Sequence, residues 1–557
     1  MTGASRRVRF GVLLAAILAA LAVIAAPASA RPMFVSSETS TRMPVIDLAS
    51  GTVSASVEGV GKGSVAVAVA PDGRRAYVAS FEAGNISVVD TATDAVISTI
   101  ALAPYSNLVG IAITPDGRKV YVADSSADQV VVIDTATYTV SKTIPLGPGS
   151  GPRPVAISPD GRWAYVAEDE AGEVAVIDTA TDTVSKTIPL PPATAPPMAL
   201  AITPDGRRLY GVGLAIGGFG LAAVTVIDTA TDVVSATFSL PGESGAFGIA
   251  ISPDGRWAYA PEPVGGEVAV IDTATDTVSK TIPLGLTAGI PFEVAVSPDG
   301  RRAYVTVIGT EEIAVLDTVN DEALAPIEVP GEHPLALGIV PDQPPTAALA
   351  PAAGLVGRPV TFDASASADP DGGTITYDWD FGDGTSAADA GPAPSHTYAA
   401  PGHYRATVTV ADDQGCSTTF VFTGQTAYCN GSGVARATVD VPVSAPPAPP
   451  AGPSPATSPF LIRGFTVNPG NGTVRARLWL SGAGTLRVRG AKVRRVHRAV
   501  AEARVLTVVV RPTPKAMKVL RRRHRLRARV RITFKPLAAP AGTEAKTLTL
   551  RRRGGGS

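Results

Sequence analysis

The chain reads Pro154-Val-Ala-Ile-Ser-Pro-Asp-Gly-Arg-Trp-Ala-Tyr-Val-Ala167 and then, after a short loop, Glu173-Val-Ala-Val-Ile-Asp-Thr-Ala-Thr-Asp-Thr-Val-Ser-Lys-Thr-Ile-Pro-Leu190. Versions of this stretch return seven times, at intervals of about 44 residues. The proline of the Pro-Asp turn stands at Pro71, Pro115, Pro159, Pro204, Pro253 and Pro298, with a diverged copy at Pro341. The aspartate that ends the Val-Ile-Asp segment stands at Asp47, Asp90, Asp134, Asp178, Asp228, Asp272 and Asp317. A fixed period of this length indicates a repeat architecture.

Four short segments of each repeat are rich in Val, Ile, Thr and Tyr, so we expect four strands, named A to D along the repeat. Pro-Asp-Gly suits the turn from A to B, because proline fixes φ, aspartate bonds to nearby backbone and glycine accepts positive φ. Seven four-stranded antiparallel sheets in series predict an all-β fold, with a seven-bladed β-propeller over residues 31–342.

The two ends of the repeat array complete one another. Phe34 precedes Asp47 by the same 13 positions that separate Tyr77 from Asp90, so the array begins at strand B of a blade. The missing strand A comes last, as Leu335-Ala-Leu-Gly-Ile-Val340. The sequence therefore predicts a ring closed by one blade that takes three strands from the N-terminal side and one from the C-terminal side.

The start of strand B carries a recurring Tyr-Val pair. It stands at Tyr77-Val78, Tyr121-Val122, Tyr165-Val166 and Tyr304-Val305. The repeats resemble the YVTN family of β-propeller repeats over residues 31–342. The resemblance implies the propeller fold and an extracellular or surface setting, and it implies no single activity.

Residues 1–30 have the pattern of a secretory signal. Three arginines precede an apolar run over residues 11–26, and Ala28-Ser29-Ala30 provides a small-residue cleavage site, so Arg31 is the expected mature N-terminus. An uncleaved membrane anchor is disfavoured because the run is shorter than about 18–20 residues. Sec and twin-arginine export both remain open. We expect a secreted or cell-surface protein without a transmembrane anchor after cleavage.

The net charge of −1 hides a strong asymmetry. From Pro459 onward 25 lysines and arginines accompany only Glu502 and Glu544, a net charge of +23. With three arginines in the signal, residues 31–458 carry a net −27. An acidic body is therefore joined to a basic C-terminal region.

The position six residues before each turn proline should begin strand A, near the mouth of the propeller channel. It is occupied by Val65, Val109, Arg153, Met198, Phe247, Phe292 and Leu335. Glu293 stands one place later, where the other copies have Ala, Gly or Pro. We take Arg153, Phe247, Phe292, Glu293 and His333 as candidate binding residues at this mouth. The alternative for the charged ones is that they are solvated loop-end side chains.

The propeller sequence offers little for catalysis. His333 is the only histidine of the ring, which also contains no cysteine, so a His or Cys metal site is not expected. No Gly-x-Ser-x-Gly motif accompanies His333. The repeated aspartates are expected to be structural, bonding to backbone N–H groups in the turn into strand D. We expect no enzyme, no metal and no cofactor; a lactonase-type propeller hydrolase is the alternative.

A different pattern follows the ring. Trp379-Asp-Phe-Gly-Asp-Gly384, within residues 343–443, resembles the signature of PKD domains. The resemblance implies an Ig-like β-sandwich with Trp379 buried and Asp383-Gly384 in a turn, and a role as a spacer or contact module. Turn chemistry is the favoured interpretation of its aspartates, and a Ca²⁺ site is the alternative. The aspartates in question are Asp369, Asp371, Asp380 and Asp383.

The two cysteines of the chain, Cys416 and Cys429, flank an apparent insertion of this domain, residues 417–428. Two neighbouring cysteines in a secreted protein usually pair, so we expect a disulfide.

Residues 444–458 are rich in Pro, Ala and Ser and read as an extended linker. Residues 459–553 largely alternate with period two, which predicts a basic β-sandwich-like domain with a short helix at 514–523, and residues 554–557 form a flexible tail. An excess of +23 attracts polyanions, for an exported protein an anionic envelope polymer or its own acidic propeller. A specific nucleic-acid ligand is not expected, because no aromatic stacking platform accompanies the charge.

Together these features favour a non-enzymatic, secreted or cell-surface binding or adhesion protein. Its propeller and PKD domain would interact with an extracellular protein or polysaccharide, and its basic domain with an anionic envelope. The alternatives are the lactonase-type hydrolase and a structural, surface-layer-like envelope component.

Overall fold

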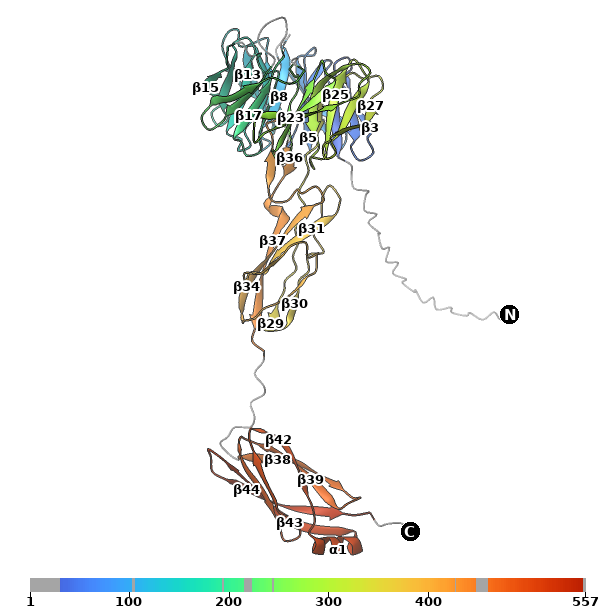
Figure 1. Ribbon diagram of the computed structural model, residues 1–557, viewed down its shortest axis with the longest axis vertical. Coiled ribbons are helices and arrows are strands. Elements are labelled where there is room, and N and C mark those ends of the chain that lie inside the picture. Colours follow the sequence, from blue (N-terminus) through green and yellow to red (C-terminus); the bar gives the residue numbers. More distant parts are fainter. Residues whose placement is uncertain are drawn as a thin grey trace, which may run out of the picture. The chain divides into compact units, whose positions relative to one another are not determined.

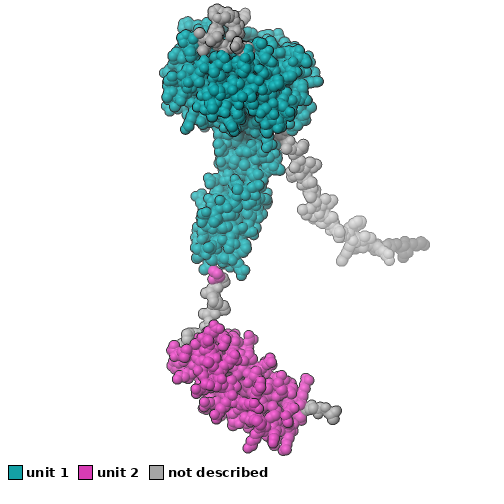
Figure 2. Space-filling model, viewed as in Figure 1, with its two compact units in different colours: residues 1–445 teal, residues 446–557 magenta. Residues whose placement is uncertain are grey.

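The computed structural model describes residues 31–102, 106–192, 195–214, 223–242, 245–425, 427–446 and 459–553. The predicted signal peptide, the body of the linker and the predicted C-terminal tail lie outside these residues. The chain forms two compact units, residues 1–445 and residues 446–557 (Figure 2).

Seven sheets of four antiparallel strands form the first part of unit 1 (Figure 1). The strands nearest the channel are β4 (Ser64–Val69), β8 (Leu108–Ile113), β12 (Pro152–Ile157), β16 (Ala199–Ile202), β20 (Ala250–Ile251), β24 (Ile290–Val296) and β28 (Pro334–Ile339). The second strands are β1 (Pro32–Ser37), β5 (Arg75–Ser80), β9 (Lys119–Asp124), β13 (Trp163–Glu168), β17 (Arg208–Val212), β21 (Trp257–Glu262) and β25 (Arg302–Ile308). The third strands are β2 (Arg42–Asp47), β6 (Asn85–Asp90), β10 (Gln129–Asp134), β14 (Glu173–Asp178), β18 (Val224–Asp228), β22 (Glu267–Asp272) and β26 (Glu312–Asp317). The outer strands are β3 (Thr52–Glu58), β7 (Ala95–Ala101), β11 (Thr139–Pro145), β15 (Thr183–Pro189), β19 (Val233–Phe238), β23 (Thr277–Pro283) and β27 (Glu322–Glu328).

The ring closes as the sequence predicts. One sheet has the order β28-β1-β2-β3, and β28 pairs with β1 in a register that places Phe34 opposite Gly338. A Cβ added at Gly338 would lie 2.5 Å from a methyl group of Val67 on the adjacent blade. A glycine is therefore required at position 338, because the neighbouring sheet packs directly against the backbone of the closing strand.

The repeated aspartates are confirmed as turn-forming residues. In every blade the aspartate that ends the third strand accepts a hydrogen bond from one or two backbone N–H groups two or three residues later, as Asp178 does from Ala180 (2.9 Å) and Thr181 (3.1 Å). These bonds satisfy turn amides on the ring surface, so the aspartates need no catalytic explanation.

The second part of unit 1 is the predicted β-sandwich. A five-stranded sheet has the order β29 (Gly354–Leu355), β37 (Arg436–Ser444), β34 (Gly402–Asp412), β31 (Ile375–Asp380) and β32 (Ser386–Ala387), and β30 (Pro359–Thr361) pairs with β33 (Ser395–Thr397). The short 3-10 helix η1 (Gly433–Ala435) precedes β37. Trp379 is buried, and its indole N–H donates to the Gly391 carbonyl at 3.0 Å. Asp383 accepts bonds from Thr385 in the predicted turn.

Unit 2 is also a β-sandwich. Its first sheet has the order β38 (Phe460–Asn468), β39 (Thr473–Leu480) and β42 (Arg504–Val510). Its second has the order β41 (Val496–Val500), β40 (Gly484–Arg489), β43 (Arg525–Pro536) and β44 (Gly542–Arg551). The predicted helix is α1 (Pro514–Arg523), capped by Thr513, and strand β41 was not predicted. Among the described residues, no helix has the length and hydropathy needed to cross a membrane.

Candidate functional site: the mouth of the propeller channel

The start of the inner strands surrounds a cavity of about 230 Å³. All seven residues six positions before the turn prolines line it, and so does Glu293. Residues at equivalent positions of the seven repeats thus form a ring around the channel, because equivalent positions of the blades face the same axis. The ring consists of Val65, Val109, Arg153, Met198, Phe247, Phe292 and Leu335.

One side of the ring is aromatic and apolar. The rings of Phe247 and Phe292 lie with centroids 4.6 Å apart and tilted by 36°. Both side chains are only partly buried, so their faces are accessible to a bound molecule. Met198 and Leu335 extend this apolar side.

Arg153 provides the positive charge of the ring, three blades away from Phe292. Its Nε lies 2.6 Å from a carboxylate oxygen of Asp169, and both side chains are about one third exposed. The ion pair fixes the guanidinium and leaves part of it accessible from the cavity. An anionic or hydroxyl group in the cavity could therefore be bound by Arg153.

Glu293 is the second polar group of the cavity. Although part of this residue is accessible, burial of its carboxyl group raises its pKa to about 8, and a hydrogen bond from the Leu337 N–H opposes that shift only partly. The carboxyl is therefore mainly protonated at neutral pH, when it is a hydrogen-bond donor rather than an anion.

His333 does not belong to this cavity. It precedes β28, its side chain is exposed, and its backbone bonds to Ser37 and Glu38 at the start of the closing blade. The structure therefore places Arg153, Phe247, Phe292 and Glu293 together and His333 apart from them. His333 is expected at the mouth from its closeness to strand A, but it stands one residue before the strand begins.

The floor of the cavity comes from a part of the chain that the sequence analysis did not connect with the ring. Strands β35 (Phe420–Phe422) and β36 (Ala427–Asn430) form a hairpin within the predicted insertion of the PKD domain. The predicted disulfide between Cys416 and Cys429 closes the base of this hairpin. In the described part of the chain the side chain of Gln425, at the hairpin tip, lines the cavity.

The hairpin bonds to the inner strands of three consecutive blades, β12, β16 and β20. Figure 1 shows β36 at the side of the propeller that faces the PKD domain. The bonds run from Ile157 N–H to Gly424 O (2.8 Å), Ile202 N–H to Thr423 O (3.0 Å), Gln425 Nε2 to Val155 O (3.1 Å) and Tyr428 Oη to Ile251 O (2.6 Å). Phe422, Ala427 and Tyr428 are buried and pack with core residues of the ring. The PKD domain is therefore anchored inside the channel, and the cavity has a floor. A signal was present in the apolar sequence Phe420-Val-Phe422 between two cysteines.

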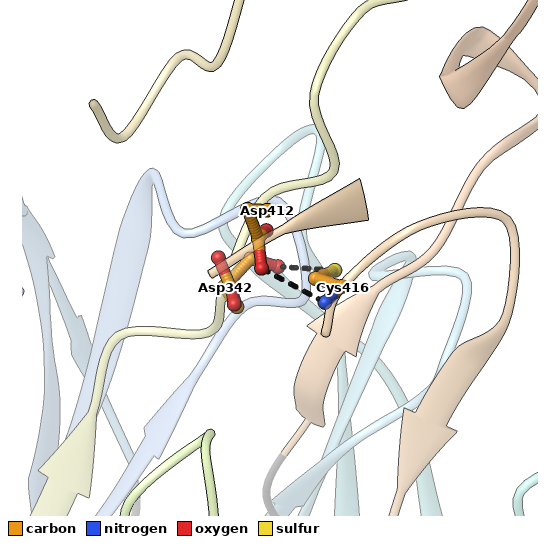
Figure 3. Close-up of side chains that lie close together, drawn as sticks. All are labelled: Asp342, Asp412 and Cys416. Carbon is orange, nitrogen blue, oxygen red and sulfur yellow. Dashed lines mark hydrogen bonds between the residues drawn. The ribbon is translucent and has the colours of Figure 1, made fainter. Parts of the chain in front are cut away.

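The junction of ring and PKD domain also contains buried charge. Arg31, the predicted first residue of the mature chain, pairs with Asp342 and lies 3.6 Å from Asp371. Asp342, Asp412 and Cys416 lie together there (Figure 3). The sulfur of Cys416 is in the disulfide and cannot act as a thiolate ligand. Burial raises the pKa of Asp342 against the opposing effect of Arg31, and burial likewise raises the pKa of Asp412.

The four aspartates considered for Ca²⁺ do not form one group. Asp369 and Asp371 precede the Ile375 end of β31, whereas Asp380 and Asp383 lie at its other end. Six strand residues correspond to about 20 Å, which is far beyond the reach of one ion. Asp383 is instead bonded to Thr385 and to His396.

Three polar side chains are found among the described residues that line the cavity: Arg153, Glu293 and Gln425. Among the described residues that line the cavity there is no His, Cys, Ser, Thr or Lys, so a nucleophile paired with a base is not assembled from them. What they do offer is an aromatic pair, a held guanidinium, a neutral carboxyl and the amide of Gln425.

Comparison with known proteins supports both folds of unit 1. Residues 28–213 match the family described as "Lactonase, 7-bladed beta-propeller", and residues 342–425 match the PKD domain family. A β-propeller followed by a PKD domain, predicted from the repeats and the tryptophan motif, is thus confirmed.

Matches to individual proteins are short. A microbial collagenase of Vibrio alginolyticus is 36% identical over 70 residues, 13% of this chain and 8% of that protein. Collagenase ColQ1 of Bacillus cereus is 39% identical over 62 residues, 11% of this chain and 6% of that protein. The pre-pro-metalloprotease PrtV of Vibrio cholerae is 47% identical over 53 residues, 10% of this chain and 6% of that protein. The chain therefore spans less than a tenth of the length of these curated relatives. Among solved structures, hydrazine synthase of Kuenenia stuttgartiensis aligns with a TM-score of 0.44 and 24% identity over 49% of this chain and 88% of that one.

Proposed function

We propose that this chain is a secreted or cell-surface binding protein, without catalytic activity, that recognises an extracellular protein or polysaccharide at the mouth of its propeller channel. The observation that carries the proposal is the ring of seven equivalent positions, which is aromatic on one side and has Arg153 on the other. If these seven positions served packing alone, all of them would be expected to be apolar, as Val65 and Val109 are.

The volume of the cavity limits what enters it. At about 230 Å³ it is smaller than the roughly 300–1,000 Å³ of pockets that enclose drug-sized ligands. The cavity therefore suits one sugar residue or one side chain, presented by a larger molecule that remains outside. This is the geometry expected of a module that recognises an end or a branch of a polymer.

Each polar group has a definite role in this proposal. The face of Phe292 would pack against the apolar face of the bound group. Arg153 would bind an anionic or hydroxyl oxygen, and protonated Glu293 would donate a hydrogen bond to a hydroxyl group. Gln425 would give the PKD domain one direct contact with the ligand.

The remaining modules would position this mouth. The PKD hairpin makes propeller and PKD domain one unit, so the PKD domain would act as a rigid support for the ring. Unit 2, with a net charge of +23 beyond Pro459, would hold the protein at an anionic envelope polymer.

A glycan array probed with the labelled protein, residues 31–557, tests the proposal. We expect binding to a restricted set of structures, and loss of at least tenfold in affinity for them in Phe292→Ala, measured by calorimetry. His333→Ala is the matched control because it changes an exposed residue of the propeller that does not line the cavity. Equal binding by wild type and Phe292→Ala would show that the mouth is not the recognition site; a blank array followed by binding to envelope proteins would favour a protein ligand.

A lactonase-type hydrolase is the second candidate, favoured by the family match over residues 28–213 and by the raised pKa of Glu293, which suits a proton donor at neutral pH. Turnover of a lactone panel that is abolished in Glu293→Gln would establish this alternative. Absence of turnover by a protein that binds glycans would support recognition.

A further inference from the structure

Eight of the 25 lysines and arginines beyond Pro459 share the outer face of the four-stranded sheet of unit 2. Outward positions alternate with buried ones along β40 and β43, so the exposed arginines of each strand share one face. We define the basic face by its eight cationic residues: Arg487, Arg489, Arg525, Arg527, Arg529, Arg531, Lys535 and Arg551.

The strand register brings like charges directly opposite one another. Arg489 on β40 faces Arg531 on β43, and Arg525 on β43 faces Arg551 on β44. Directly opposed like charges destabilise a sheet. An arrangement that is unfavourable for the isolated fold is explained if an external anion neutralises it.

Within residues 459–553, no carboxylate forms an ion pair with a residue of the basic face. Glu544 lies opposite Ile532 and therefore projects from the opposite face of the sheet, where it pairs with Lys546 at 2.6 Å. Within residues 459–553, which the structure describes, this is the one ion pair closer than 4.0 Å. The basic face is consequently a cationic surface without internal partners.

The spacing of the face suits a linear polymer. Four outward arginines follow one another along β43, and residues two apart in a strand are separated by about 6.5–6.8 Å. Hydroxyl groups of Thr485, Thr533, Thr547 and Thr549 share the face with them. Arginine and threonine are among the side chains that contact phosphate oxygens in complexes.

We infer that the basic face is a binding track for a linear phosphodiester polymer of the cell envelope, such as a polyol phosphate. This inference rests on the proposed association of unit 2 with an anionic envelope. A lipid surface fits less well, because β40, β43 and β44 expose no large apolar side chain and Leu537, just after β43, is a single one. A nucleic-acid single strand fits less well because the face offers one aromatic ring, His497 opposite Arg487, rather than a series of rings on which successive bases could stack.

The test compares two full-length variants that lose the same charge from different faces. The face variant carries Arg→Gln at positions 525, 527, 529 and 531 of β43. The control variant carries Arg→Gln at four exposed arginines of the three-stranded sheet, Arg463, Arg475, Arg477 and Arg504. The probe is poly(glycerol phosphate), titrated by calorimetry from low to high NaCl.

We expect the face variant to bind at least tenfold more weakly at low salt, and the control to remain within about threefold of wild type. Since each phosphate contact contributes about 0.7 to the slope of log affinity against log salt for a single strand, four lost contacts should reduce that slope by about 3. Equal weakening of both variants would overturn the inference by showing that overall charge alone binds. Binding of polygalacturonate, single-stranded DNA or phosphatidylglycerol vesicles as tightly as poly(glycerol phosphate) would overturn the assignment to a phosphodiester polymer.

Two further measurements keep the result interpretable. The thermal transition of unit 2 should be unchanged or higher in the face variant, because repulsion has been removed; a lowered transition would show that the arginines serve the fold. Co-sedimentation with envelopes separates this inference from the proposed function. If wild type binds the pure polymer but not envelopes, the basic face remains a polymer-binding track and the proposed association of unit 2 with the envelope is overturned. If envelope binding survives in the face variant, that association remains and the basic face is overturned as its site.

Discussion

Substitution of Gly424 by valine should drive the PKD hairpin out of the propeller channel. Gly424 has φ +106°, and a Cβ there would lie 3.1 Å from the Ala156 Cβ and 3.2 Å from a methyl group of Ile202. The substitution therefore adds backbone strain of about 1–3 kcal/mol and overpacking of about 1–3 kcal/mol. The chain can relieve the overpacking only by withdrawing the hairpin from the propeller channel.

Gly415→Val is the matched control, since Gly415 also has positive φ, +89°, but has no atom within 4 Å of an added Cβ. It should carry the backbone strain without the overpacking. The stability difference between the two variants then isolates packing in the channel, about 1–3 kcal/mol, which corresponds to about 5- to 150-fold in an equilibrium constant.

Hydrogen exchange of two amides provides the assay. The N–H groups of Ile157 and Ile202 donate to the hairpin carbonyls of Gly424 and Thr423, so withdrawal of the hairpin exposes them to solvent. We expect these amides to exchange about 5- to 150-fold faster in Gly424→Val than in Gly415→Val. Unchanged exchange at both amides, or equal acceleration in both variants, would refute the account of the hairpin as an anchor within the ring.

Two more predictions concern the same unit. Because the pKa of Glu293 is raised in the folded state from 4.5 to about 8, the folded protein holds a proton that the unfolded chain releases in this window, and stability should fall as pH rises through it. In urea denaturation Glu293→Gln should match wild type near about pH 4 and exceed it near about pH 9 by up to about 5 kcal/mol, since each pKa unit corresponds to about 1.4 kcal/mol; parallel curves would contradict the burial of this carboxyl. The double variant Cys416→Ala/Cys429→Ala should unfold with about 3 kcal/mol less free energy, because the disulfide closes a loop of about 14 residues; wild type with reductant should behave alike, and an unaltered transition in both would show that the hairpin is held by its ring contacts alone.

The ring could be predicted from the sequence because its information is local and repeated. The equal spacing of Phe34 from Asp47 and of Tyr77 from Asp90 predicts the closure, and alignment of the repeats places Arg153 and Phe292 in the same mouth, three blades apart. The alignment says less about His333, because it fixes positions along strand A and not the residue that precedes the strand.

The floor of the mouth could not be predicted in the same way. The side chain of Gln425 donates to the backbone of Val155, 270 positions earlier in the chain. No sequence pattern around either residue indicates this contact. Strand β41 escaped prediction for a different reason, because Val496-His-Arg-Ala-Val500 places charged and small residues where alternation would show apolar ones. Contacts made by single, non-repeated segments depend on the assembled surface rather than on any local preference.

Closure by a split blade also imposes an order of events on the growing chain. The pair Phe34 and Gly338 is separated by 304 positions, so β1 is made first and must wait for its inner partner until nearly the whole ring has been synthesised. Contacts over such distances form slowly because a long loop must be closed before they stabilise anything. The hairpin that fills the channel is made later still. Ring closure and channel filling therefore belong to the last stage of assembly, and until then an unpaired strand edge is the part of the nascent protein most exposed to misassociation.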